Sequence, residues 1–562
     1  MRSFETDVLI IGGGGAGAMA AYEASKHGVR VAMALKGLPQ RCGNTVLAPG
    51  AIAAVGDWHL PADSQDLHFA DTVKGGSFMN EQRLVRIMVE ESPSHILELE
   101  RIGALWQRES DGVTYSLRID GGHSFHRCPF LEDRTGREML RAMFGEIRRR
   151  NIPILSNLMV LKLLQKNGRV NGAVALNLEN MEPVLIRTKA TILGCGGAGN
   201  LYRNTTNPAG ATGDGFILAL EAGAELMDME FVQFYPLGFL FPDSLRGALG
   251  GLLYYLRLLN RKGERFMERY DPERLELSTR DRVARAIYTE VQEGRGGPHG
   301  GVFGDMTYHE PGYLDRMIPA LCQTYRKIGI EPTRDYVELA PTCHFFMGGV
   351  RVDQNWQTSL PGLFAVGENS AGLHGGNRLS QNALAELLVS GARAGKWAAK
   401  FARENPPLPV DGREAREAIA RADRLLCREK GLRPIELRHR LRTMMWEKVS
   451  VIRSEESLQS AGKELEIIED DLERQAPALR SRIWNQEVAE GLENSFLVKT
   501  AHLVIRAAQM RTESRGAHFR SDYPQGDNAH WLQHIILRQV DGRIETRRMA
   551  VDLAEMRPEG GK

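Results

Sequence analysis

Three closely spaced glycines near the N-terminus form the first pattern that could hold a ligand. They read Gly12-x-Gly14-x-x-Gly17 and follow directly after residues 8–11, an apolar run that predicts a buried parallel strand. Residues 16–26 then favour a helix. Glycines permit a tight turn and let the backbone approach a pyrophosphate at the N-terminus of that helix. Because the glycines stand between a strand and a helix, they predict a dinucleotide-binding unit.

The elements that must position this turn are spread along the chain. Residues 29–33 predict the second strand of the unit, and residues 190–194 and 362–368 predict two more. Since the last two segments lie far apart in sequence, we expect the nucleotide domain to be interrupted by an insertion over residues 231–345.

The C-terminal part of the chain has a different pattern. After a proline-rich break at residues 406–409, apolar residues recur every three to four positions, which indicates amphipathic helices. The expected helices span residues 413–429, 435–452, 454–472 and 479–510. Beyond Asp522 the sequence indicates a hairpin with Asp541-Gly542 as its turn.

Charge and cysteine content exclude several classes of function. Lysine and arginine (72) balance aspartate and glutamate (71), so the net charge gives no reason to expect nucleic acid as a partner. The six cysteines form no Cys-x-x-Cys pair, so we expect neither a metal site nor an iron–sulfur cluster in this chain. Their scatter suits a reducing cytoplasm, and no apolar stretch is long enough to span a membrane.

Many short motifs occur in an order that resembles the fumarate reductase/succinate dehydrogenase flavoprotein family, which includes L-aspartate oxidase. The matches extend from Asp7 to about His518 and so cover most of the chain. Besides the glycine turn they include Asn44-Thr45, Asp133–Gly136, Gly196–Gly199, Thr212–Gly215, Gly263–Met267, Arg280-Asp281, Met347–Gly349, Gly375–Leu379 and Glu513–His518.

The resemblance implies an α/β fold in which a Rossmann-like FAD-binding domain is interrupted by an α+β capping domain and followed by a C-terminal helical bundle. On this basis we expect an FAD-binding domain at residues 1–230 and 346–403, a capping domain at 231–345, a helical domain at 410–520 and a tail at 521–562.

The resemblance also implies which residues bind FAD. They are Gly12, Gly14, Gly17, Lys36, Asn44, Thr45, Gly50, Asp214, Glu368, Arg378 and Ser380. One branch of the family attaches FAD covalently through a histidine that precedes a threonine, and in this chain that position is Asn44. Since asparagine lacks the ring nitrogen that forms the bond, we expect non-covalent FAD.

The family reaction moves a hydride between flavin N5 and one carbon of a carbon–carbon bond conjugated to a carboxylate, while a proton moves at the neighbouring carbon. Arg280 matches the family's proton donor, and Asp243-x-x-Arg246 has the spacing of the relay that reloads it. His344 and Arg378 match the clamp on one substrate carboxylate, where a planar guanidinium can bind two oxygens.

Two departures fall where the family holds the far end of its substrate. The chain reads Tyr235-Pro-Leu-Gly where the family commonly has His-Pro-Thr-Gly, so Tyr235 offers a ring and one hydroxyl to the substrate. Pro242 replaces a threonine and has no side-chain donor. These changes put fumarate or succinate itself in question, and an aryl or alkyl enoate fits as well.

Three functions follow from these residues. The leading one is a dehydrogenase or enoate reductase subunit whose electrons come from an iron–sulfur partner, in the cytoplasm, with any membrane attachment through partner subunits. The second is an amino-acid oxidase similar to L-aspartate oxidase, because Asp120 stands where that relative has an acidic residue facing the substrate amine. The third is a non-catalytic flavin-carrying assembly subunit, which the retained Arg280, His344 and Arg378 disfavour.

Overall fold

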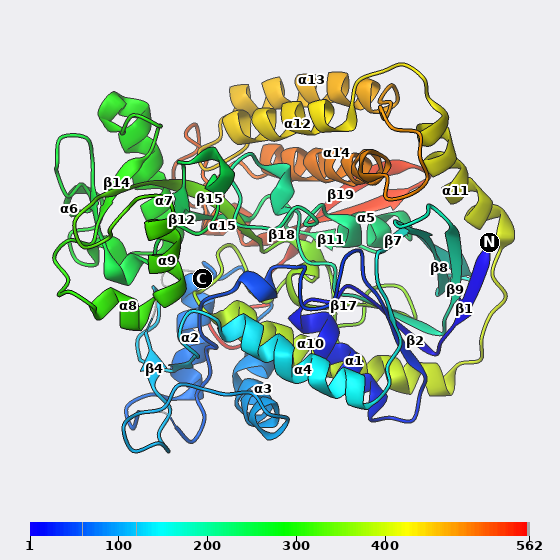
Figure 1. The fold of residues 1–562 in the computed structure, drawn as a ribbon, viewed down its shortest axis with the longest axis horizontal. Coiled ribbons are helices and arrows are strands. Elements are labelled where there is room, and N and C mark those ends of the chain that lie inside the picture. Colours follow the sequence, from blue (N-terminus) through cyan, green and yellow to red (C-terminus); the bar gives the residue numbers. More distant parts are fainter. Residues whose placement is uncertain (59, 120, 559–562) are drawn as a thin grey trace.

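The structure is a computed structural model that describes residues 1–58, 60–119 and 121–558. Figure 1 shows a capping region in green at the left, a layer of yellow and orange helices along the top, and a sheet with blue and cyan helices across the centre and bottom. The α/β fold expected from the sequence, with a capping region and a helical C-terminal part, is confirmed.

A five-stranded parallel sheet forms the centre of the nucleotide-binding region. Its strand order is β17 (Leu363–Ala365), β10 (Ala190–Leu193), β2 (Val8–Ile11), β3 (Val31–Ala34) and β6 (Ile154–Leu155). Every neighbouring pair is parallel, and all four residues of β2 are buried. The continuous apolar runs are explained by this burial on both faces.

Helices lie beside this parallel sheet, and the first and last of them make most of the contacts with its strands. They are α1 (Gly15–Ser25), α2 (Gln65–Gly75), α3 (Gln82–Arg101), α4 (Thr135–Arg149) and α10 (Asn382–Glu404). α1 and α10 pack against each other, and α10 presents glycines at the contact. A Cβ on Gly391 would lie 2.6 Å from the carbonyl oxygen of Ala16, so the two backbones could not approach this closely with a larger residue.

Two smaller sheets flank the nucleotide-binding region. One has the order β1 (Arg2–Glu5), β9 (Pro183–Arg187), β8 (Arg169–Asn177) and β7 (Leu158–Lys166). The other is the short pair β4 (Leu117–Arg118) and β5 (Cys128–Pro129).

The capping region has its own antiparallel sheet and its own hydrophobic core. The strand order is β12 (Val232–Phe239), β15 (Val337–Phe346), β14 (Val302–Asp305) and β13 (Arg257–Leu259). Helices α6 (Met267–Tyr270), α7 (Arg280–Glu290), α8 (Tyr313–Met317) and α9 (Pro319–Lys327) surround it. Because β12 and β15 are antiparallel neighbours, with Val232 opposite Phe346, the two ends of this segment lie side by side.

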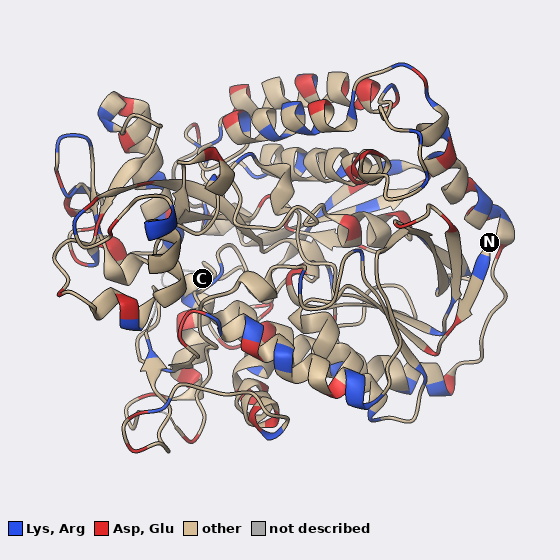
Figure 2. Ribbon diagram, viewed as in Figure 1, with Lys and Arg blue, Asp and Glu red and all other residues tan. Residues whose placement is uncertain are grey.

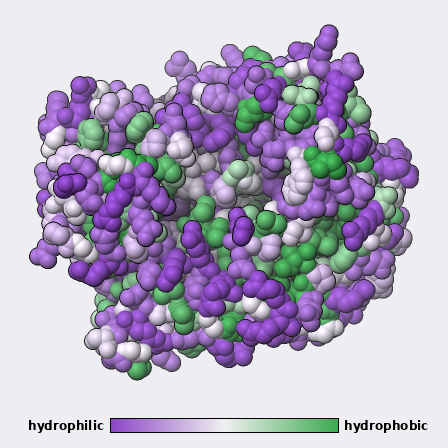
Figure 3. Space-filling view, viewed as in Figure 1, coloured by the Kyte–Doolittle hydropathy of each residue, from purple (hydrophilic) through white to green (hydrophobic). Residues whose placement is uncertain are grey.

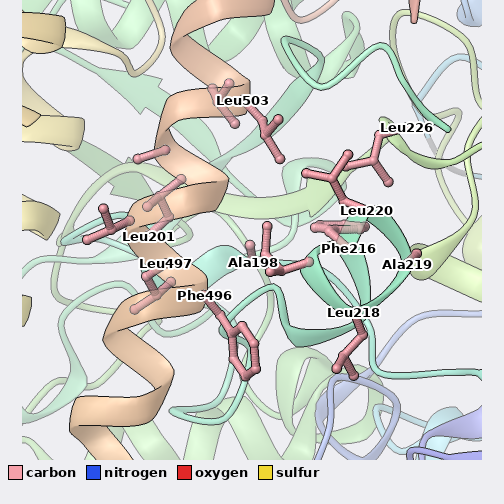
Figure 4. Packing of buried hydrophobic residues seen from close by; sticks show 14 of the residues in the cluster. Ala198, Leu201, Phe216, Leu218, Ala219, Leu220, Leu226, Phe496, Leu497 and Leu503 are labelled. Atoms are coloured by element: carbon pink, nitrogen blue, oxygen red, sulfur yellow. The ribbon is translucent and has the colours of Figure 1, made fainter. Parts of the chain in front are cut away.

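The predicted C-terminal helices are present with shifted ends. They are α11 (Gly412–Cys427), α12 (Pro434–Lys448), α13 (Glu455–Leu472) and α14 (Gln486–Met510). The largest shift is at α14, which begins at Gln486 rather than Leu479 because Asn485 caps it by accepting a hydrogen bond from the N–H of Val488. Figure 4 shows Phe496 and Leu497 of α14 beside Ala198 and Phe216, the latter on α5 (Asp214–Glu221).

The predicted C-terminal hairpin is present and joins a sheet that the sequence did not predict. Strands β18 (Gln533–Val540) and β19 (Arg543–Ala550) flank Asp541-Gly542, both with positive φ, as a two-residue hairpin turn requires. β18 also pairs with β11 (Leu226–Met227), which in turn pairs with β16 (Gly349–Val350). The tail therefore pairs with a strand before the capping insertion, in a sheet that also contains a strand after the insertion.

The surface carries both signs of charge. Figure 2 shows lysine and arginine interspersed with aspartate and glutamate on the outward faces of the helices. Within the described part of the chain, no helix is both long enough and apolar enough to cross a membrane.

A buried ion pair holds the hairpin in place and predicts a pH-dependent stability. His534 of β18 is fully buried, and its Nδ1 lies 2.5 Å from Asp228 Oδ2, while Nε2 lies 3.4 Å from Glu81 Oε1. Burial alone would lower the pKa of His534, but the charges and hydrogen bonds of the two carboxylates raise the pKa to about 9. His534 is therefore protonated in the folded protein at neutral pH.

We expect the stability from this pair to be present below pH about 6.5, the unfolded pKa of histidine, and to be lost as pH rises toward 9. The upper limit of the loss is about 3 kcal/mol, which corresponds to the shift from 6.5 to about 9. Thermal unfolding at pH 6 and pH 9.5 should show a smaller drop in Tm for His534→Gln than for the wild type. Equal drops in the two proteins would contradict the assignment.

Candidate active site

A cavity of about 1030 Å³ lies at the carboxyl ends of the parallel strands and extends under the capping region. Ligand sites commonly have about 300–1,000 Å³, so this cavity has room for a dinucleotide and a small substrate together. Figure 3 shows a hollow near the centre of the corresponding face. The predicted site residues that line it are Gly12, Gly14, Lys36, Asn44, Thr45, Gly50, Asp214, Tyr235, Arg280, His344, Glu368 and Arg378.

The glycine turn fits a pyrophosphate. Gly12 has φ of +113°, and a Cβ there would overlap the carbonyl oxygen of Gly194; a Cβ on Gly17 would overlap the carbonyl oxygen of Gly12. A Cβ on Gly14, by contrast, would meet only Thr45 Oγ1, at 3.7 Å. Gly14 therefore faces the cavity at the N-terminus of α1, where the helix dipole favours an anion. The N–H of Gly15 donates to Thr45 Oγ1 at 3.0 Å.

Lys36 forms an ion cluster at one end of the cavity. Its Nζ lies 2.8 Å from Asp214 Oδ2 and 2.8 Å from Glu493 Oε1, and it donates to Thr212 Oγ1 at 2.8 Å. Burial opposes the charge on Lys36, but the two carboxylates raise its pKa. Glu493 comes from α14, so the helical region contributes to this wall of the cavity. Sequence reasoning missed Glu493, because within α14 it has the pattern of an ordinary buried helix position.

Asn44 and Glu368 meet on another wall. Asn44 Nδ2 donates to Glu368 Oε2 at 2.7 Å and to Asn207 Oδ1 at 3.1 Å, so its amide is engaged with protein groups. Burial raises the pKa of Glu368 to about 7, although the N–H of Phe346 donates to its Oε1.

The segment after Arg378 closes over the cavity. Gly50 allows Gln381 to approach, because a Cβ on Gly50 would overlap Gln381 Oε1. That oxygen accepts from the N–H of Ala51 at 2.6 Å. Ser380 does not line the cavity itself; its Oγ accepts a hydrogen bond from Arg280, and its carbonyl oxygen lies 2.6 Å from His123 Nε2.

Arg280 is the first residue of α7, which carries its guanidinium to the cavity. Nη2 donates to Ser380 Oγ at 2.5 Å, Nη1 lies 3.5 Å from Gln233 Oε1, and the guanidinium lies 4.9 Å from the centre of the Tyr235 ring. The neighbouring Asp281 accepts from Asn377 Nδ2 at 2.9 Å. Arg280 is therefore held by side chains of both the capping and nucleotide-binding regions.

The two residues of the expected carboxylate clamp lie beside Arg280. Arg378 is buried and its Nη2 donates to Gln233 Oε1 at 3.0 Å. His344 on β15 is joined to Thr206 Oγ1 through Nδ1 at 2.8 Å. Burial, and then the charges of Arg378 and Arg280, hold the pKa of His344 well below its usual range. His344 is therefore a neutral hydrogen-bonding group between two cations.

Gln233 is a site residue that the sequence analysis missed. Its Oε1 accepts from both Arg280 and Arg378, and its Nε2 donates to Asn377 Oδ1 and to the carbonyl oxygen of Arg378. It thus sets the spacing of the two guanidinium groups. A signal was available: Gln233 stands two positions before Tyr235 on the same strand, where alternate residues share a face.

Tyr235 corrects one expectation from the sequence. We expected its hydroxyl to face the substrate, but the hydroxyl donates to the carbonyl oxygen of Gly251 at 2.9 Å inside the capping region. The ring, 5.3 Å from the His344 ring, lines the cavity. Tyr235 therefore offers the cavity an aromatic face.

Asp243 and Arg246 lie apart from the cavity. They pair with each other at 2.6 Å on a short surface segment, and the Asp243 side chain is 85% exposed. Neither belongs to the cavity lining, so the structure does not bring them together with Arg280. Their role as a proton relay stays a prediction. Asp120, on which the amino-acid oxidase alternative rests, lies outside the described residues.

Comparison of the chain with known proteins shows the family to which it belongs. The chain matches a model of an FAD-binding domain over residues 7–384 and a model of the fumarate reductase flavoprotein C-terminal region over residues 438–561. It is 42% identical to a subunit of the fumarate reductase (CoM/CoB) from Methanothermobacter marburgensis, over 95% of this chain and 97% of the relative. It is 33% identical to the succinate dehydrogenase flavoprotein subunit of Rickettsia bellii, over 94% and 92%.

Solved structures agree with the sequence relatives. The fold superposes on a variant of the Escherichia coli quinol fumarate reductase protein FrdA with a TM-score of 0.94, at 32% identity, over 99% of this chain and 98% of that one. The chain therefore belongs to the fumarate reductase/succinate dehydrogenase flavoprotein family and is an FAD-dependent oxidoreductase that acts on CH–CH bonds.

Proposed function

We propose that the chain transfers a hydride between FAD and an α,β-unsaturated mono- or dicarboxylate, or the saturated acid in the reverse direction, with Arg280 as proton donor. One observation carries the proposal: Arg280, His344 and Arg378 line the same cavity as the glycine turn and Glu368. The relatives named for fumarate and succinate support the substrate class.

In the proposed reaction, different residues of this chain bind the substrate and transfer the proton. Arg378 and neutral His344 would bind the carboxylate and hold the carbon–carbon bond in place, since a guanidinium fork and an imidazole N–H are both donors. Bound FAD supplies the hydride in reduction and accepts it in oxidation. Arg280 would deliver the proton to the carbon next to the carboxylate and stabilise the negative charge that develops there.

An assay with the purified protein tests this function. We expect reduced methyl viologen to be oxidised only when an enoate such as fumarate, acrylate or cinnamate is present. An absence of turnover with all three acids would contradict the proposed function.

We propose further that FAD is held without a covalent bond. Asn44 occupies the attachment position of the covalent branch, and its amide nitrogen is hydrogen-bonded to Glu368 and Asn207. Acid precipitation should therefore release all the flavin into the supernatant. Flavin fluorescence that stays with the protein band on a denaturing gel would contradict non-covalent binding.

We also propose that electrons reach the flavin through an iron–sulfur partner subunit, as the family resemblance implies, with a cytoplasmic location and any membrane attachment through partners. The names of the relatives as subunits support an assembly. Affinity purification from the native cell should recover this chain with a cysteine-rich protein containing iron and acid-labile sulfide. Recovery of the chain alone, with full physiological electron transfer, would contradict the partner.

A further inference from the structure

The polar groups of the substrate end of the cavity are concentrated on one side. Arg280, Arg378 and His344 all line this cavity, and Gln233 Oε1 accepts a hydrogen bond from each of the two arginines. One carboxylate can therefore satisfy this set. A second carboxylate at the other end of the substrate would need donors of its own, because a buried anion without partners is strongly disfavoured.

The capping region also contributes an apolar part of the cavity lining, around Tyr235, although Gln323 and Thr324 of α9 line the cavity as well. Among the described residues 231–345 that line the cavity, Arg280 is the only one with a permanent charge. The side chains next to Tyr235 on this wall are Phe239, Leu245, Ala248, Leu249 and Leu252. They belong to, or pack against, the hydrophobic core of the capping region.

The backbone of this wall is also turned away from the cavity. In the loop over residues 247–251, the N–H groups of Gly247 and Gly250 donate to the carbonyl oxygens of Phe239 and Leu237, each at 2.8 Å. The carbonyl oxygens of Gly247, Gly250 and Gly251 accept from the hydroxyls of Thr342, Tyr325 and Tyr235, respectively. The loop thus satisfies these polar groups within the capping region and presents apolar side chains.

A cationic side chain is close in sequence but not on the wall. Arg246 lies one residue before this loop, pairs with Asp243 and is absent from the cavity lining. The part of the lining that residues 239–252 form is consequently hydrophobic and includes the half-buried Leu245.

We propose that the preferred substrate is a monocarboxylate with an apolar substituent on the carbon β to the carboxylate, such as a β-alkyl or β-aryl acrylate. The proposal rests on the proposed function and narrows it. In reduction, the hydride from reduced FAD forms a C–H bond at the β carbon and the proton from Arg280 forms one at the α carbon. The C=C π bond breaks, and oxidised FAD and the saturated acid are the products.

A substrate series tests this with the flavin-loaded chain and reduced methyl viologen. We expect kcat/KM for crotonate or cinnamate to exceed that for fumarate by at least tenfold, since one methylene in a hydrophobic pocket already changes kcat/KM by about tenfold or more. A ratio below ten overturns the inference while the proposed function stands. No turnover with any enoate overturns both.

A charge placed on the wall gives an independent test. Leu249→Lys should lower the crotonate-to-fumarate ratio of kcat/KM by about tenfold or more, because the ammonium group supplies a partner for a second carboxylate. The matched control is Ser244→Lys, which adds the same charge to an exposed residue of the neighbouring segment outside the lining. If the lysine variant does not fold, the same ratio is measured for Leu249→Thr, which adds a smaller polar group to the wall. Ratios that stay equal to wild type in the folded Leu249 variant overturn the inference.

Discussion

Replacing Arg280 with glutamine or lysine should lower enoate reduction by about 10³-fold or more while the protein keeps its FAD and its visible spectrum. The size follows from losing a positioned proton donor and a cation beside the developing charge. Lysine keeps the charge but cannot reach both Ser380 Oγ and Gln233 Oε1 with one planar group, so it should rescue little of the rate.

Arg282 provides a matched control for this experiment. It lies two residues further along α7, pairs with Asp271 and is not part of the cavity lining. Arg282→Gln should stay within about threefold of wild type. If Arg280→Gln kept more than a tenth of the wild-type kcat, the role of Arg280 as proton donor would be wrong. A rise in KM alone would instead place Arg280 in substrate binding.

Parts of the fold that depend on local pattern could be predicted from sequence. The strand before Gly12, the helix after it and the hairpin around Asp541-Gly542 all follow from apolar periodicity and from glycine at positions that need it. The distant strands of the parallel sheet were also predictable, because each is a short apolar run that ends in glycine-rich sequence.

Contacts between distant segments could not be predicted in this way. Whether the Tyr235 hydroxyl faces a substrate or the carbonyl of Gly251 depends on the path of a loop sixteen residues away. Glu493 reaches Lys36 only because α14 packs across α5. Neither relation leaves a local sequence signal, so motif matching assigns the residue but not its orientation or its partner.

The resemblance to the flavoprotein family has the same limit: it assigns residues to a site but does not fix their orientation or their partners. It assigned Arg280, His344 and Arg378 to one site, and all three line the same cavity, Arg280 from the start of α7, His344 from β15 and Arg378 from the loop before α10. It did not place Asp243 and Arg246, which lie on a short exposed segment where local packing decides the geometry.

Adding a single methyl group at Gly14 should separate cofactor binding from folding. The backbone of Gly14 has φ of −69°, which alanine adopts without strain, and the nearest atom to a Cβ would be Thr45 Oγ1 at 3.7 Å. Gly14→Ala should therefore leave the Tm of the FAD-free protein unchanged within about 2 °C. Its Kd for FAD, measured by flavin fluorescence quenching, should rise at least tenfold, because the methyl group occupies space where a phosphate approaches the backbone.

Gly12→Ala should behave differently. Its Cβ would overlap the carbonyl oxygen of Gly194, and φ of +113° is strained for alanine, so both folding and FAD binding should suffer, with a stability loss of about 2 kcal/mol or more. Gly462→Ala, on an open face of α13, controls for the added methyl group itself. If Gly14→Ala bound FAD as tightly as wild type, the glycine turn would be a folding requirement alone and the pyrophosphate would lie elsewhere in the cavity.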